Sequence, residues 1–344
     1  MKIAANGRRS TIQHTIRGEA NMTIRAGGQA ILIVFLVLLG AESRPRPASD
    51  GPKVELIGEG VISTPGDEFG GAMSPDGHSI YFCRSVPTSY LYVICVSHLD
   101  GHGQWSAPEV MPFSGQWRDS DPVLSPDGKT LLFASDRPVN GVDLHHFHIW
   151  RSALGAKGWS DPEMIPGRIN EVDATQLFAS MAANGTIYFT SGRNHKGRFD
   201  VFRSKLVDGR YGEPEPLPEL SSGQSTTIEA FIAPDESYII LGSFGREDAL
   251  GSSDLYISYN QNGHWSKPQN VGPGINSKAR DYSPRVSPDG QYLIFASERG
   301  FPTDPHDQNM SYDDFIKGTH EILNGYGNIY RVPMSYVFET TRPH

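Results

Sequence analysis

The stretch SPDGHSIYFCR, residues 74–84, decides the fold of this chain. Proline presets φ, aspartate hydrogen-bonds its own backbone and glycine accepts positive φ, so the first four residues predict a tight turn. The same tetrapeptide returns at 125–128 and 287–290, and degenerate copies occur at 182–185 and 233–236. A unit of about 50 residues that repeats five times is typical of a β-propeller.

Each turn is followed by three further elements of the repeat. The first is a strand rich in aromatic and β-branched residues, and it leads in every copy to an arginine. The five versions read SIYFCR, TLLFASDR, TIYFTSGR, YIILGSFGR and YLIFASER. A second strand with alternating polar and apolar residues comes next, and in four copies an aromatic residue shortly before a proline then introduces an outer strand. We therefore predict an all-β propeller of four-stranded antiparallel blades.

The fifth copy predicts how the ring closes. It ends at the segment RVP (331–333) without the aromatic–proline element, whereas a spare strand, VELIG (54–58), lies at the other end of the repeats. We expect this N-terminal strand to complete the last blade, because closure removes exposed sheet edges. The count favours five blades, with a six-bladed ring as the alternative.

The region before the repeats has the features of a secretory signal. Arg25 precedes AILIVFLVLL (30–39), and small residues follow. Ten apolar residues are too few to span a bilayer, which favours a signal peptide. The alternative is an uncleaved N-terminal anchor. The expected divisions are residues 1–43 as extension and signal peptide (with Met22 as a possible true start), 44–52 as linker, 53–338 as propeller and 339–344 as tail. We predict export to a periplasmic or extracellular location.

The repeats resemble the WD40-like PD40 repeats of TolB-type propellers. The resemblance rests on the SPDG turn, the strand that contains Tyr or Phe and the closing arginine, and it covers residues 53–338. It implies a binding or scaffolding role in a bacterial envelope. The chain departs from the peptidases that carry such propellers, since it contains no G-x-S-x-G motif. It also departs from six-bladed TolB in having five repeats and no separate N-terminal α/β domain.

Acidic residues precede or begin each inner strand, where we expect the mouth of the central channel. The candidate ligand-binding residues are Glu68, Asp119, Asp121, Glu229 and Asp281. The arginines that recur are Arg84, Arg137, Arg193, Arg246 and Arg299, and we interpret them as structural. A ring of unpaired carboxylates is self-repulsive, which favours pairing between the acids and these arginines. Residues that break the repeat symmetry are better candidates for function.

Three further features of the sequence each have more than one interpretation, and the first two break the symmetry of the repeat. His146 and His148 are weak metal candidates beside the simpler reading of a solvated loop that leads into a strand. The insertion 300–327 either caps the channel or forms one wall of a site, or it packs outside its own blade, with a short helix near Tyr312. Cys83 and Cys95 flank a predicted hairpin and either form a disulfide or are two small buried residues.

The predicted function is an exported binding or scaffold module for a protein, peptide or oligosaccharide, acting as a monomer. The alternatives are a polysaccharide-active glycosidase or lyase with two of the channel carboxylates Glu68, Asp121, Glu229 and Asp281, and a structural domain stabilised by Ca²⁺. A net charge of −9 argues against nucleic acid as a partner. Contact with a membrane is expected only through an uncleaved signal segment.

Overall fold

The computed structural model describes residues 51–195, 197–221, 225–301 and 309–342. These residues belong to one compact unit, Ala48–His344. The predicted signal segment and most of the linker lie outside the described residues. Within the described part of the chain, no helix is long and apolar enough to cross a membrane.

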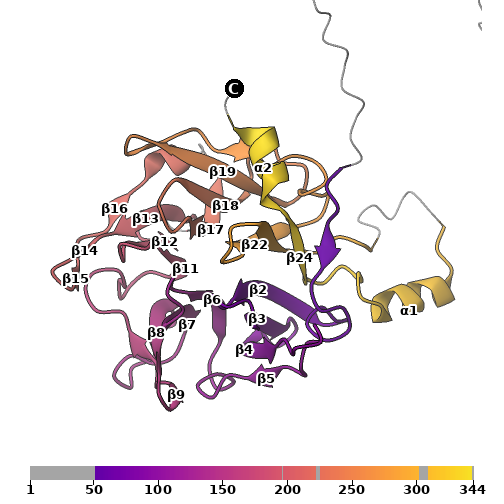
Figure 1. Ribbon diagram of the computed structural model, residues 1–344, viewed down its shortest axis with the longest axis horizontal. Coiled ribbons are helices and arrows are strands. Elements are labelled where there is room, and N and C mark those ends of the chain that lie inside the picture. Colours follow the sequence, from indigo (N-terminus) through magenta and orange to yellow (C-terminus); the bar gives the residue numbers. More distant parts are fainter. Residues whose placement is uncertain (1–50, 196, 222–224, 302–308, 343–344) are drawn as a thin grey trace, which may run out of the picture. The chain divides into compact units, whose positions relative to one another are not determined.

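The described unit is a five-bladed β-propeller, which confirms the predicted fold (Figure 1). Each blade is an antiparallel sheet with its first strand innermost. Blade 1 consists of β2 (Asp67–Met73), β3 (Ser79–Val86), β4 (Leu91–His98) and β5 (Glu109–Val110). Blade 2 consists of β6 (Asp119–Leu124), β7 (Thr130–Ser135), β8 (His148–Gly155) and β10 (Glu163–Met164), with β9 (Gly158–Trp159) extending β8. Blade 3 consists of β11 (Gln176–Met181), β12 (Ile187–Ser191), β13 (Asp200–Ser204) and β16 (Glu215–Pro216).

The other two blades repeat the pattern. Blade 4 consists of β17 (Thr226–Ile232), β18 (Tyr238–Phe244), β19 (Ser253–Gln261) and β21 (Gln269–Asn270), with β20 (His264–Trp265) extending β19. Blade 5 consists of β22 (Asp281–Val286), β23 (Tyr292–Ser297), β24 (Asn328–Pro333) and β1 (Glu55–Leu56). Outside the blades lie the hairpin of β14 (Leu206–Val207) with β15 (Arg210–Tyr211), a 3₁₀ turn at Pro218–Leu220, and helices α1 (Tyr312–His320) and α2 (Met334–Thr341).

In blades 1, 2 and 5 the SPDG turn joins the inner strand to the second strand and is held by local hydrogen bonds. In blade 1 the Ser74 hydroxyl donates to the Asp76 carboxylate at 2.5 Å and accepts from the amide of Ser79 at 2.9 Å. Gly77 has φ of 73°, as its place in the turn requires. The copies at Ser125 and Ser287 make the same contacts.

The N-terminal strand closes the ring as predicted. Glu55 pairs with Arg331 and Leu56 with Tyr330, so β1 is the outer strand of blade 5. The amide of Ile57 donates to the carbonyl of Ile329 at 2.9 Å, which continues the pairing by one residue. Blade 5 is therefore built from both ends of the repeat region.

Five apolar clusters hold the ring together, one in each gap between neighbouring blades. Apolar side chains alternate along each strand, so each blade contributes one face to each of two gaps. Helix α2 extends the cluster between blades 4 and 5, where Met334 and Val337 are buried. This helix continues to Thr341 and therefore crosses the expected start of the tail at residue 339.

Cys83 and Cys95 are both buried and unbridged. In the β3–β4 pairing Cys83 lies opposite Ile94, whereas Cys95 lies opposite Phe82. The two thiols therefore point to opposite faces of blade 1, Cys83 into the gap with blade 2 and Cys95 into the gap with blade 5. The disulfide alternative was wrong, because the register is offset by one residue.

Candidate functional site

Every inner strand contains a β-bulge, which is a shift in register against its second strand. A bulge re-aims the side chains beside it and is a common feature next to functional sites. The inner strands align on one position, which is occupied by Glu68, Asp119, Gln176, Thr227 and Asp281. We call the residue two positions further along each strand its ring position. They are Gly70, Asp121, Phe178, Glu229 and Ser283. Asp121, Phe178 and Ser283 have φ between 51° and 56°, which is strained for residues other than glycine.

A pocket of about 570 Å³ lies at the channel mouth, and three of the ring positions, Asp121, Glu229 and Ser283, line it. Aromatic side chains supply much of the remaining wall. They are Phe69, Tyr90, Tyr92, Phe147, Tyr282 and Tyr326. A pocket that combines aromatic and apolar side chains with a few convergent charged groups is the usual form of a small-molecule site.

Glu229 is the carboxylate of this pocket that burial perturbs most clearly. Its side chain is 3% exposed, and its Oε2 atom has no hydrogen-bond partner among the described residues. Its Oε1 atom lies 4.0 Å from a guanidinium nitrogen of Arg280. Burial raises the pKa of Glu229 to about 7, although Arg280 and Arg285 act in the opposite direction. Glu229 is therefore poised to gain or lose a proton near neutral pH.

The second strand of blade 4 makes room for this carboxylate. Gly242 pairs with Glu229 across β17 and β18. A Cβ atom added at Gly242 would lie 1.7 Å from Glu229 Oε2. The corresponding residues of the other second strands are Cys83, Ala134, Thr190 and Ala296. A glycine here, where every other blade has a side chain, is thus explained by the acid that packs on it.

Asp121 faces the same pocket from blade 2. It accepts a hydrogen bond from the Ser120 hydroxyl at 3.1 Å. Burial raises the pKa of Asp121 above its usual value, and the charge of Arg285 partly offsets this effect.

Two arginines lie beside these acids. Arg280 stacks on the ring of Tyr282, with 3.8 Å between the guanidinium carbon and the ring centre, and approaches Glu298 at 3.5 Å. Arg285 is 2% exposed, stacks on Phe178 at 3.9 Å and donates to the carbonyl of Pro122 at 3.3 Å. Burial lowers the pKa of Arg285 to about 10, so it remains charged at neutral pH.

Three of the five candidate acids are engaged elsewhere. Glu68, Asp119 and Asp281 have fully buried side chains. Each pairs with the recurring arginine of its own blade, at nitrogen–oxygen distances of 3.1, 2.6 and 2.7 Å for Arg84, Arg137 and Arg299 respectively. These acids do not line the pocket.

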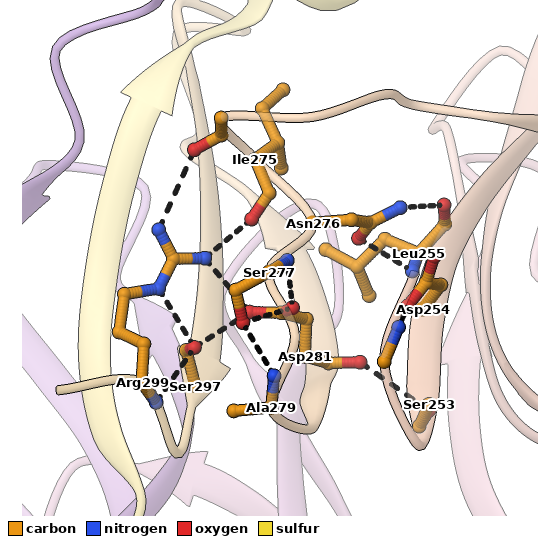
Figure 2. Close-up of polar contacts among 12 residues, drawn as sticks. Ser253, Asp254, Leu255, Ile275, Asn276, Ser277, Ala279, Asp281, Ser297 and Arg299 are labelled. Carbon is orange, nitrogen blue, oxygen red and sulfur yellow. Dashed lines mark hydrogen bonds and ion pairs between the residues drawn. The ribbon is translucent and has the colours of Figure 1, made fainter. Parts of the chain in front are cut away.

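Figure 2 shows this arrangement in blade 5. The Asp281 carboxylate accepts hydrogen bonds from Arg299, from Ser297 at 2.6 Å and from the hydroxyl of Ser277 at 2.8 Å. Arg299 also donates to the carbonyl of Ile275 in the segment that precedes β22. The pair therefore joins the inner strand, the second strand and the entering loop.

Blades 3 and 4 lack this acid, because Gln176 and Thr227 stand at the position that Asp281 occupies in blade 5. Arg193 approaches Glu171 at 3.4 Å instead, and Arg246 donates to the carbonyl of Leu220 at 2.7 Å. Each of the five arginines binds the entering loop of its blade or the acid at the start of the inner strand.

Neither candidate histidine lines the pocket, although Phe147 between them does, and both contact the segment that leads into β11 of blade 3. A ring nitrogen of His146 is 3.2 Å from the Thr175 hydroxyl, and one of His148 is 3.3 Å from the carbonyl of Glu171. Among the described residues, no group of three or more His, Cys, Asp or Glu side chains is placed to hold a metal ion.

The insertion contributes to the pocket at its end. Gly325 and Tyr326 line the pocket, and Asn324 donates to the carbonyl of Pro65 at 2.9 Å. Helix α1 forms near Tyr312 as expected, but it has no buried residue. The insertion thus forms one wall of the channel mouth through its last residues.

Arg280, Arg285 and the aromatic wall were not predicted from the sequence. One signal for Arg285 was available in the aligned inner strands, where Ala72, Val123, Ser180 and Phe231 occupy the equivalent position. A single charged residue among uncharged ones breaks the symmetry of the repeat. The aromatic wall comes from inner strands, loops and the insertion, so no single repeat position marks it.

No known family matches this chain, and no curated protein matches it. Several solved structures are similar in fold. An endo-arabinase from Bacteroides thetaiotaomicron has 14% identity and a TM-score of 0.49, over 79% of this chain and 96% of that one. A thermostable family-43 glycoside hydrolase has 11% identity and a TM-score of 0.48, over 70% and 86%.

A puromycin hydrolase is also similar, with 12% identity and a TM-score of 0.39 over 76% of this chain. The similarity spans 40% of the length of that hydrolase. Similarity at this level says nothing about the substrate or activity of this chain.

Proposed function

We propose that this chain is a binding module and that its ligand occupies the pocket at the channel mouth. The observation that carries the proposal is this pocket, two of whose lining residues, Glu229 and Ser283, have a buried oxygen without a hydrogen-bond partner among the described residues. Buried polar atoms in folded proteins are nearly always hydrogen-bonded, to protein, water or ligand. Aromatic rings around them supply contact area for a ligand of limited size.

The proposal includes export and membership of the PD40 type. The apolar run 30–39 after Arg25 supports export, and the SPDG turns with their closing arginines support the repeat type. A monomer that binds a peptide, a protein segment or an oligosaccharide is consistent with a pocket formed within one closed ring.

A thermal-shift screen of the chain from Lys53 onward tests the binding proposal. The probes are peptides, oligosaccharides, small organic ions and divalent cations including Ca²⁺. A ligand that binds the folded state raises the melting temperature, by an amount set by its concentration relative to Kd. Binding at the pocket requires that Tyr92→Ala weakens the response, whereas the same change at the exposed Tyr312 of α1 leaves it unchanged.

A hit that is insensitive to Tyr92→Ala would contradict the pocket assignment. A rise in melting temperature with Ca²⁺ alone, without any response to the other probes, would instead favour the calcium-stabilised structural domain.

A second candidate function is glycoside cleavage, and one observation favours it. Of the four carboxylates considered, Glu68 and Asp281 are held by arginines, while Asp121 and Glu229 remain at the pocket. A glycosidase needs one protonated and one ionised carboxyl group, and Glu229 is the better candidate for the protonated one.

Product analysis on any oligosaccharide that binds separates the two functions. An enzyme releases shorter sugars. Glu229→Gln or Asp121→Asn should then lower the rate of release by more than about 100-fold, the scale of general acid–base catalysis. An unchanged oligosaccharide after long incubation with the wild-type chain rules cleavage of that sugar out.

A further inference from the structure

The charges that line the pocket are predominantly negative. Four carboxylates line it, from Asp67, Asp121, Glu229 and Glu298. One arginine, Arg280, is among the lining residues, and it is shared between two of these acids at 4.0 Å and 3.5 Å. Arg285 adds a second positive charge behind Asp121, where it is buried. The acids therefore outnumber the cations by two when all are ionised.

Two of the acids accept hydrogen bonds from uncharged donors, which do not neutralise the negative charge of the carboxylates. Asp121 is bonded to the Ser120 hydroxyl, and Asp67 accepts from the hydroxyl of Ser85 and from the amide of Gly327. None of these donors carries a charge. Glu229 keeps one oxygen without a hydrogen-bond partner among the described residues. The pocket thus offers carboxylate oxygens with negative charge that is only partly compensated.

The aromatic residues of blades 1 and 5 form a corner beside these acids. Phe69 and Tyr92 meet edge to face, with ring centres 6.1 Å apart and planes at 83°. Phe69 and Tyr282 lie 6.0 Å apart at 38°. Arg280 already stacks on Tyr282, so a cation occupies that ring. Aromatic faces arranged at a corner next to carboxylates favour organic cations, because the ring faces carry negative potential.

We infer that the ligand of the channel-mouth pocket carries an ammonium group, which binds between Asp121 and Glu229 against the rings of Phe69 and Tyr92 in the aromatic corner. The inference rests on the proposed function and adds the chemical class of the ligand. An anion would meet the excess of carboxylates, and a neutral sugar would leave that excess uncompensated in a partly dehydrated site.

Calorimetric titration with a charged probe and its neutral isostere tests the inference. Choline carries a fixed positive charge, and 3,3-dimethylbutan-1-ol has nearly the same shape without the charge. We expect choline to bind to the chain from Lys53 onward at least about 10-fold more tightly than the alcohol at pH 8. Tetramethylammonium and spermidine serve as further ammonium probes of smaller and larger size.

Substitutions test whether choline binds at the two acids, and melting temperatures separate a loss of charge from a loss of folding. Asp121→Asn and Glu229→Gln should each weaken choline binding by about 5-fold or more, because each removes one attractive charge. Glu219→Gln is the matched control, since Glu219 is exposed and lies ten residues before Glu229. Its affinity should equal that of the wild type. Melting temperatures of all variants confirm that they are folded.

The pH dependence gives a readout that a purely structural role of Glu229 does not move. The charged or titratable groups that face it are Arg280, Arg285, Asp121 and Tyr282. The pKa of Glu229 is about 7, so its carboxylate forms as the pH rises through neutrality. Choline affinity should increase by about 3-fold or more from pH 6 to pH 8 in the wild type, and should stay level in Glu229→Gln.

The outcomes distinguish this inference from the proposed function. Equal binding of choline and its isostere, or binding of neutral saccharides alone, would overturn the ammonium assignment, and sensitivity to Tyr92→Ala would then still support the pocket as the site. Binding that survives Asp121→Asn, Glu229→Gln and Tyr92→Ala alike would overturn both. Failure of all ammonium probes to bind would also overturn the inference.

Discussion

At the scale of single residues, Glu229 shows how burial makes the ionised form of a carboxyl group unfavourable in the folded protein. Its pKa rises from 4.5 to about 7, which at 1.36 kcal/mol per unit amounts to about 3 kcal/mol. The folded state binds the proton more tightly than the unfolded state. Stability is therefore highest below the unfolded pKa and falls as the pH rises from about 4.5 through 7.

We predict that Glu229→Gln stabilises the protein above pH 7. The amide does not ionise, so the variant avoids up to about 3 kcal/mol of unfavourable burial that the wild type has at pH 8. The advantage should shrink toward pH 5, where Glu229 is protonated. Chemical denaturation at pH 5, 6, 7 and 8 measures both curves.

The control is again Glu219→Gln, which changes an exposed acid and should parallel the wild type across this range. A Glu229→Gln variant that is less stable than the wild type at every pH would show that the carboxylate is net stabilising, contrary to its burial.

Gly242 is the second residue whose identity the pocket dictates. A methyl group at this position would overlap Glu229 Oε2 at 1.7 Å, so Gly242→Ala must displace the carboxylate or shift β18. We expect a loss of about 1–3 kcal/mol, the range for overpacking in a core. Gly101→Ala is the control, because no atom lies within 4 Å of its added Cβ. Thermal unfolding of both variants makes the comparison, and equal melting temperatures would contradict it.

At the scale of elements, strand register decides what a side chain meets. The offset of one residue between Cys83 and Cys95 sends the two thiols into different gaps between blades. Burial raises the pKa of both thiols above the ordinary value. Both cysteines act as small apolar residues of two separate clusters.

We therefore predict that reducing agent leaves the melting temperature unchanged. Both thiols should react with a thiol reagent only slowly in buffer, and two thiols per chain should react in guanidinium chloride. A fall in melting temperature on reduction, or fewer than two reactive thiols after unfolding, would indicate a disulfide and a different β3–β4 register.

At the scale of the whole molecule, the ring depends on a strand from the far end of the repeats. Figure 1 shows β1 beside β24, in colours from opposite ends of the sequence. Without β1, the outer edge of β24 would be unpaired, and an unpaired edge is a site for aggregation. Ile57, which is 6% exposed in the gap between blades 5 and 1, would be lost with it.

We predict that a chain beginning at Gly58 is less stable than one beginning at Lys53. Loss of the buried Ile57 alone costs about 2 kcal/mol, and loss of the strand pairing adds to this. The shorter chain should also associate with itself more readily. Thermal unfolding and light scattering of the two chains measure these effects, and identical behaviour would mean that β1 does not close the ring.

The sequence alone determined the five-bladed ring, the strand order within a blade and the closure by residues 54–58. These follow from local turn chemistry and from a pattern that recurs five times, so each copy supports the reading of the others. Pairing of the recurring arginines with Glu68, Asp119 and Asp281 was also predictable, because both partners recur in register.

Only the tertiary structure decided which acids face the pocket and what surrounds them. Asp121 and Glu229 differ from the paired acids by two positions and by a bulge, a distinction that depends on register against the second strand. Arg280, Tyr282 and the end of the insertion come from blade 5 and Phe69 and Tyr92 from blade 1, so they meet only when the ring closes. Long-range contacts of this kind leave no local pattern, which is why the site emerged from the structure.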